Sequence, residues 1–95
     1  MWNQVENIVL ANKSATPASF TLRGGNYSIE AVATWGGGSV TLNRLAADGS
    51  TYVSTGISFT ANGYQNQNLP SGTYQLAIAS ATAVYVDIVS TVTTL

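Results

Sequence analysis

The side chains that carry most enzyme chemistry are scarce in this chain. Its 95 residues include no histidine and no cysteine, and only three basic and four acidic side chains. The acids Glu6, Glu30, Asp48 and Asp87 are the one set that could act together, because a pair of carboxylates can hydrolyse a glycosidic bond. Nothing in their spacing brings two of them together, and no base accompanies the abundant Ser and Thr. We therefore expect no enzymatic activity and no catalytic residue.

The same scarcity bears on metal ions and cofactors. Zinc and iron sites are built mainly from Cys and His, and calcium loops need several neighbouring acids, whereas Asp48 stands alone. The glycine run at residues 36–38 has the composition of a phosphate-binding loop, but no helix and no Lys-Ser/Thr pair follows it. We expect neither a metal nor a cofactor.

The net charge of −1 argues against two classes of partner. Nucleic-acid binding needs clustered basic side chains, and Lys13, Arg23 and Arg44 are scattered. The sequence has no basic amphipathic helix, and its longest apolar stretch, residues 76–86, is too short to span a bilayer. The first residues lack the basic and apolar regions of a secretory signal. We expect no nucleic acid and no membrane among the partners.

Apolar residues recur at every second position, which is the pattern of half-buried strands. Residues 27–35 place Tyr27, Ile29 and Trp35 on one face, and this phase favours a core role for Trp35 over stacking on a sugar ring. Turn signals recur every ~8–12 residues, the spacing of a sandwich or barrel. We predict an all-β fold, an antiparallel, jelly-roll-like β-sandwich of about eight short strands. The expected strands are 20–22, 27–35, 39–45, 51–54, 57–61, 64–69, 74–79 and 83–92.

Two dipeptides predict tight β-hairpins. Asp48-Gly49 should join strand 39–45 to strand 51–54, and Asn62-Gly63 should join strand 57–61 to strand 64–69. Asn-Gly is the stronger of the two signals, because both residues tolerate positive φ.

Residues 1–19 differ from the β-sandwich domain expected over residues 20–95. Their apolar side chains do not alternate cleanly, and residues 15–18 have the composition of an extended linker. Residues 5–11 form either an edge strand or part of an arm that contacts a neighbouring molecule. On the second interpretation the arm spans residues 2–15, with Trp2, Ile8 and Leu10 as anchors.

Four motifs over residues 20–89 together resemble small structural proteins of tailed bacteriophages, especially the β-sandwich decoration (cement) proteins of the capsid. The resemblance implies binding to the outer capsid lattice, often as a symmetric oligomer, with no catalytic residues to carry over. The motifs are Gly24-Gly25-Asn26-Tyr27, Trp35-Gly36-Gly37-Gly38-Ser39-Val40-Thr41-Leu42, Asp48-Gly49-Ser50-Thr51-Tyr52-Val53 and Leu69-Pro70-Ser71-Gly72-Thr73-Tyr74.

We therefore predict a virion structural protein, made in the host cytoplasm and located on the capsid exterior. Its expected partners are the major capsid protein and further copies of itself, with a trimer favoured over a dimer because capsid threefold positions are common binding sites. The alternatives are a carbohydrate- or receptor-binding module of a phage fibre, which would use Trp35 and outward tyrosines including Tyr85, or a tail or neck component. The residues expected to contact the capsid or another subunit are Trp2, Ile8, Leu10, Arg23, Arg44, Tyr52 and Tyr64.

Overall fold

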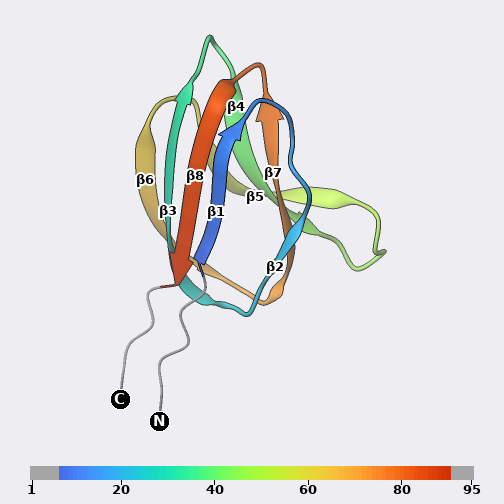
Figure 1. The fold of residues 1–95 in the computed structure, drawn as a ribbon. Coiled ribbons are helices and arrows are strands. Elements are labelled where there is room, and N and C mark those ends of the chain that lie inside the picture. Colours follow the sequence, from blue (N-terminus) through green and yellow to red (C-terminus); the bar gives the residue numbers. More distant parts are fainter. Residues whose placement is uncertain (1–6, 91–95) are drawn as a thin grey trace.

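Two antiparallel four-stranded sheets pack face to face in the computed structural model, which describes residues 7–90 (Figure 1). The all-β sandwich predicted from the alternating pattern is confirmed. The strands are β1 (Asn7–Lys13), β2 (Phe20–Leu22), β3 (Gly25–Thr34), β4 (Ser39–Leu45), β5 (Tyr52–Phe59), β6 (Gly63–Leu69), β7 (Gly72–Ala79) and β8 (Thr82–Ser90).

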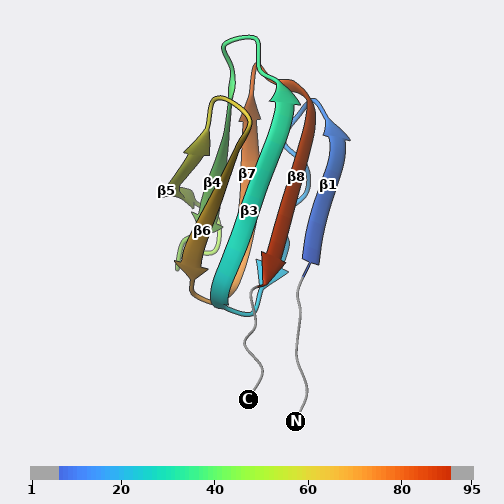
Figure 2. The ribbon, with the colours of Figure 1, turned by 90° about the vertical axis from the view of Figure 1, so that its left-hand side faces the viewer.

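The strand order identifies a jelly roll. One sheet has the order β1-β8-β3-β6 and the other has the order β2-β7-β4-β5. The chain passes to the opposite sheet at every connection except the one between β4 and β5, which is the connectivity of two interlocked Greek keys. Figure 2 shows the first sheet in front of the second, with β1 and β6 at its two edges.

The core lies between the sheets and is built from the inward half of each alternating strand. Tyr27, Ile29 and Ala31 of β3 face Val40 and Leu42 of β4 across the sandwich, all of them buried. No polar or charged residue among residues 7–90 is buried, so the core is held by apolar packing. The remaining buried side chains are Leu22, Ile57, Phe59, Leu69, Tyr74, Leu76, Ala81, Val84, Val86 and Ile88.

The N-terminal segment is an integral part of this sandwich. β1 pairs with β8 and forms one edge of the first sheet, and Ile8 and Leu10 pack against the core of the same chain. The connection to β2 is attached by two side-chain hydroxyls: Thr16 accepts from the backbone N–H of Ile78 at 3.0 Å, and Ser14 accepts from that of Ala83 at 3.4 Å. Residues 7–16 therefore form an edge strand and its connection, not an arm that extends from the domain.

Of the two expected hairpins, one is confirmed and the other is wrong. Asp48-Gly49 joins β4 to β5 in the same sheet, with Gly49 at a φ of 78°. Asn62-Gly63 instead connects β5 to β6 in the opposite sheet, and neither residue has a positive φ. The Asn62 side chain explains why: its Oδ1 accepts from Ala33 N–H at 3.2 Å and from Trp35 Nε1–H at 2.9 Å, closing one end of the sandwich.

Residues 51–61 also differ from the prediction of two separate strands. β5 runs continuously from Tyr52 to Phe59, and its register against β4 shifts between Leu42 and Asn43. Gly56 has a φ of 89°, and the Thr55 hydroxyl donates to the carbonyl of Leu42 at 2.8 Å. The shift leaves Thr55 and Gly56 of β5 without a partner in β4, a bulge placed at the glycine that made one strand look like two.

Candidate interaction surfaces

The outer face of the sheet β1-β8-β3-β6 exposes apolar and aromatic side chains. Val9 is 61% exposed, Val32 45%, Tyr64 60% and Tyr85 49%, one residue from each strand of the sheet. Val32 lies directly opposite Tyr85 in the register of β3 and β8. We call these four residues, with the acids described next, the valine–tyrosine face. Exposed apolar groups gathered on one sheet are typical of a surface that contacts another molecule.

Two of the acids lie at the centre of this face. Glu30 on β3 is directly opposite Asp87 on β8, and the row continues to Val9 on one side and Tyr64 on the other. The structure thus corrects the expectation that no two acids come together. Asp87 Oδ1 is buried, and no donor among residues 7–90 reaches it. Because Glu30 is exposed on an open sheet, the pair suits contact with a basic or amide donor better than acid–base catalysis.

Polar amides cover the β6 edge of the same sheet. A hollow of about 410 Å³ is lined by Asn26, Tyr64, Asn66, Gln67 and Asn68. Asn68 Nδ2 donates to Asn26 Oδ1 at 2.8 Å, and the Tyr64 hydroxyl donates to Asn66 Oδ1 at 3.1 Å. We call β6, which carries most of these side chains, the amide edge.

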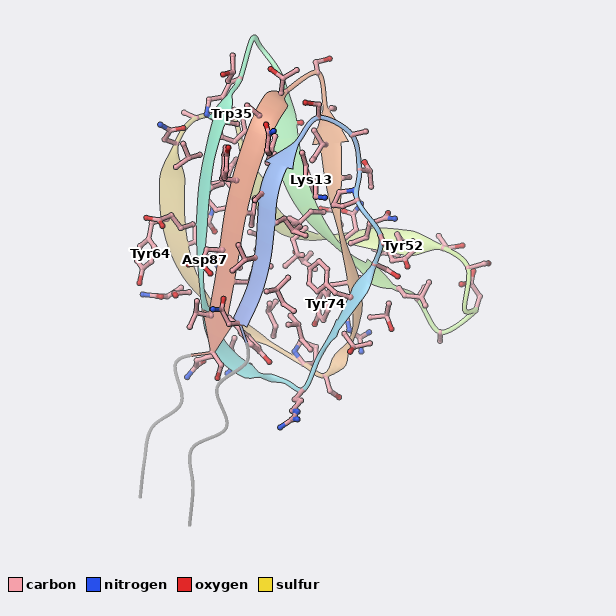
Figure 3. The ribbon with its side chains drawn as sticks, in the orientation of Figure 1. Lys13, Trp35, Tyr52, Tyr64, Tyr74 and Asp87 are labelled. Atoms are coloured by element: carbon pink, nitrogen blue, oxygen red, sulfur yellow. The ribbon has the colours of Figure 1, made fainter. Side chains whose placement is uncertain are left out.

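The aromatic residues divide between core and surface. Tyr74 is buried between the sheets and its hydroxyl donates to the carbonyl of Pro70 at 2.6 Å, whereas Tyr64 projects away from β6 (Figure 3). Trp35 is partly buried against the core. Position 38, three residues later, needs a glycine because a Cβ there would meet the carbonyl oxygen of Ala79. Tyr52 lies on the hairpin that projects from the other sheet, partly exposed. Trp35 therefore closes one end of the sandwich.

The basic residue Arg44 acts within the fold. It shares its register position and its face with buried Tyr74, and its guanidinium carbon lies 6.0 Å from the Tyr74 ring centre. Its Nη2 donates to the carbonyl of Ser71 at 2.7 Å, and Gly72 leaves the space that the guanidinium fills. Arg44 therefore covers the end of the core opposite Trp35, although the sequence suggested a contact with another molecule.

The other expected contact residues do not form one surface. Arg23 is exposed in the connection between β2 and β3, Tyr64 lies on the valine–tyrosine face, and Tyr52 belongs to the opposite sheet. Ile8 and Leu10 point into the sandwich, and Trp2 lies outside the described residues. Sequence reasoning missed Val9 and Val32, because alternation identifies outward positions without showing which of them are neighbours.

Asp48 stabilises the hairpin between β4 and β5. Its carboxylate accepts from the Thr51 hydroxyl at 2.6 Å and from the backbone N–H groups of Ser50 and Thr51, each at 2.9 Å. The Thr51 hydroxyl and then these two N–H groups stabilise the charged form and lower the pKa of Asp48 to about 2. Both carboxylate oxygens accept hydrogen bonds within the turn, which gives Asp48 a structural role.

Within the part of the chain that the structure describes, three or more metal-ligating side chains do not gather anywhere, and no helix is long and apolar enough to cross a membrane. The sheet β1-β8-β3-β6 provides an exposed surface with apolar, acidic and amide regions. Comparison of the chain with protein-family models, curated proteins and solved structures found no match.

Proposed function

We propose that this protein is a virion structural subunit that decorates the outside of a phage capsid and stabilises its shell. The observation that carries the proposal is the valine–tyrosine face, where Val9, Val32, Tyr64 and Tyr85 are about half exposed on one sheet. Such a face suits a broad protein contact, since aromatic side chains are the strongest interface anchors. The major capsid protein is the proposed partner.

The acid pair defines what that partner must offer. Glu30 and Asp87 place like charges opposite each other across the strand pair, and a basic or amide side chain from the shell would offset them by contact with the exposed Glu30. A capsid repeats its binding sites, so an oligomer with modest affinity per site becomes firmly attached when several copies bind at once. The subunit is therefore proposed to sit on the capsid exterior as a homo-oligomer, after synthesis in the host cytoplasm.

Shell binding tests this proposal directly. Purified protein is mixed with mature and immature shells and sedimented, and the bound copies and the shell melting temperature are measured. We expect binding with a raised melting temperature, and at least a tenfold weaker affinity for Tyr85→Ser and Val9→Ser. The matched control is Val53→Ser, which removes an equally exposed valine from the other sheet. The proposal fails if neither shell binds the protein, or if all three variants bind as the wild type does.

The expected contact of Trp2 with the shell is tested by deleting residues 1–6 and not the whole arm predicted over residues 2–15. Removal of residues 1–6 leaves β1 intact, whereas removal of residues 1–15 would take away a strand that pairs with β8. Reduced shell binding by the shorter deletion would support Trp2 as an anchor. Undiminished binding would remove it from the contact residues.

Carbohydrate binding is a second candidate, favoured by the hollow at the amide edge. An exposed tyrosine surrounded by amide donors and acceptors provides both stacking and hydrogen bonds for a sugar ring. Titration with soluble oligosaccharides, followed by NMR, should then shift the resonances of Tyr64 and Asn66, and Tyr64→Ala should abolish the shifts. An unchanged spectrum across neutral and acidic oligosaccharides would remove this candidate.

A further inference from the structure

A jelly roll has four edge strands, and three of them here carry features that prevent pairing with another chain. β2 has only three residues. β1 ends in a register shift, with Asn12 at a φ of 54° followed by the charged Lys13. β5 contains the bulge at Gly56, and its Ser58 carbonyl accepts from Gln65 Nε2 at 3.5 Å. Short length, charge, bulges and side-chain cover are the usual protections of a sheet edge.

The amide edge β6 has none of these protections. Its seven residues pair with β3 without a register shift, from Gly25–Leu69 to Ala31–Gly63. The strand contains no charged residue and no proline, and among residues 7–90 its only strand partner is β3. The backbone N–H and C=O groups on its other side are therefore free to form a ladder with one more strand.

The side chains of β6 suit an identical strand. Its middle residues are all amides, and each amide is both a donor and an acceptor, so an antiparallel pair of β6 strands is complementary to itself. Amides already pair at this edge, where Gln67 Nε2 donates to Gln65 Oε1 at 3.2 Å. Around a twofold axis at Asn66, Tyr64 of one copy lies opposite Asn68 of the other, and no like charges meet.

We propose that two copies of this chain pair antiparallel through β6, joining their sheets into one continuous eight-stranded sheet. The nearest like charges are the two Glu30 side chains, each on β3. Their two β3 strands are three strand spacings apart, about 14 Å, which alone exceeds the Debye length at physiological ionic strength. This inference rests on the homo-oligomer of the proposed function and gives it two copies in place of the trimer favoured from the sequence. Shell binding does not depend on it, because pairing uses the edge of the sheet and leaves the valine–tyrosine face open.

The oligomeric state tests the pairing. We expect sedimentation equilibrium of the full chain to show a dimer, and Asn66→Lys to raise its dissociation constant at least tenfold by placing like charges across the axis. Asn66→Glu should do the same, and an equimolar mixture of the two variants should restore the dimer. Val53→Lys, on the β5 edge, is the matched control and should dimerise as the wild type does.

Hydrogen exchange of the wild-type protein provides a second measurement that needs no variant. Backbone amides of β6 should exchange faster when the protein is diluted below its dissociation constant, whereas amides of β5 should not change. A wild-type monomer at high concentration, a trimer, or a dimer insensitive to both Asn66 variants would overturn the pairing. Shell binding would still decide the capsid proposal in each of these cases.

Discussion

The outer face of the sheet β2-β7-β4-β5, the hydroxylic face, pairs Thr and Ser hydroxyls across two of its strands, whereas that of the sheet β1-β8-β3-β6 is apolar and acidic. On the former, Thr41 and Ser58 lie opposite each other with their hydroxyl oxygens 3.2 Å apart. On the latter, the row Val9, Asp87, Glu30 and Tyr64 places two like charges side by side between exposed apolar groups. Hydroxyl pairs stabilise a sheet, and like charges directly opposite destabilise it.

This difference bears on which face makes the proposed contact with another molecule. A face under selection for stability alone would resemble the hydroxylic one, because its cross-strand pairs need no partner. The valine–tyrosine face places like charges opposite each other and exposes apolar area, and proteins depart from such local rules mainly at functional sites. In the proposed function, the sheet β2-β7-β4-β5 maintains the fold and the valine–tyrosine face is the contact surface.

The largest effect should come from the core that both sheets share. Ile29→Ala removes a fully buried side chain of β3, and we expect it to lower the free energy of unfolding by about 2–5 kcal/mol. Ser28→Ala, its outward neighbour, should change it by less than about 0.5 kcal/mol. Urea unfolding measures both. Similar losses for the two variants would mean that the outer face is not a solvent face and would break the comparison.

A smaller effect is expected at the end of the sandwich where Asn62 joins the two sheets. Asn62→Ala leaves the indole N–H of Trp35 and the N–H of Ala33 to water, and loss of these exposed hydrogen bonds should lower stability by about 0.5–1.5 kcal/mol. Trp35 emission, measured in a Trp2→Phe background, should shift to the red. Asn62→Asp keeps an acceptor oxygen and should retain the wild-type emission; if it shifts as far as the alanine variant, the hydrogen bond is not what holds Trp35.

Removal of one acid of the Glu30–Asp87 pair should raise the free energy of unfolding, whereas the two preceding variants lower it. Glu30→Gln removes the repulsion across β3 and β8, and we expect it to raise the free energy of unfolding by about 0.2–1 kcal/mol at low salt. Part of the gain should disappear in 1 M NaCl, where the Debye length is about 3 Å. Glu30→Lys should stabilise at least as much, because it converts the pair to opposite charges. Destabilisation by both variants would show that the acids support the sheet.

The smallest effect belongs to Asp48, on the sheet that maintains the fold. Its folded-state pKa of about 2 lies below the ordinary value of 3.8, so its contribution to the hairpin is complete above about pH 4. That contribution is lost as the pH falls through 2. An NMR titration should report the low pKa directly, and Thr51→Val, which removes the hydroxyl donor, should raise it toward 3.8. An unchanged pKa in that variant would assign the shift to the backbone donors alone.

The candidate surface could be predicted only in part. The sequence named Tyr64 as a contact residue and Tyr85 among the outward tyrosines of the fibre alternative, and both side chains are exposed. The contact of Arg44 with Tyr74 could not be predicted, because it depends on the pairing of β4 with β7, which no local pattern encodes. The acid pair was missed for the same reason, since Glu30 and Asp87 belong to strands that are distant in the sequence.

The sequence by itself determined the all-β class, the inward residues of most strands and the Asp48-Gly49 hairpin, because alternation and turn chemistry act between near neighbours. Only the tertiary structure decided which strands share a sheet. In a jelly roll nearly every connection crosses to the opposite sheet, so Asn62-Gly63 became a crossing where an isolated segment would favour a hairpin. The amide edge and the valine–tyrosine face follow from that pairing, since local preferences fix the direction of a side chain but not its neighbours across the sheet.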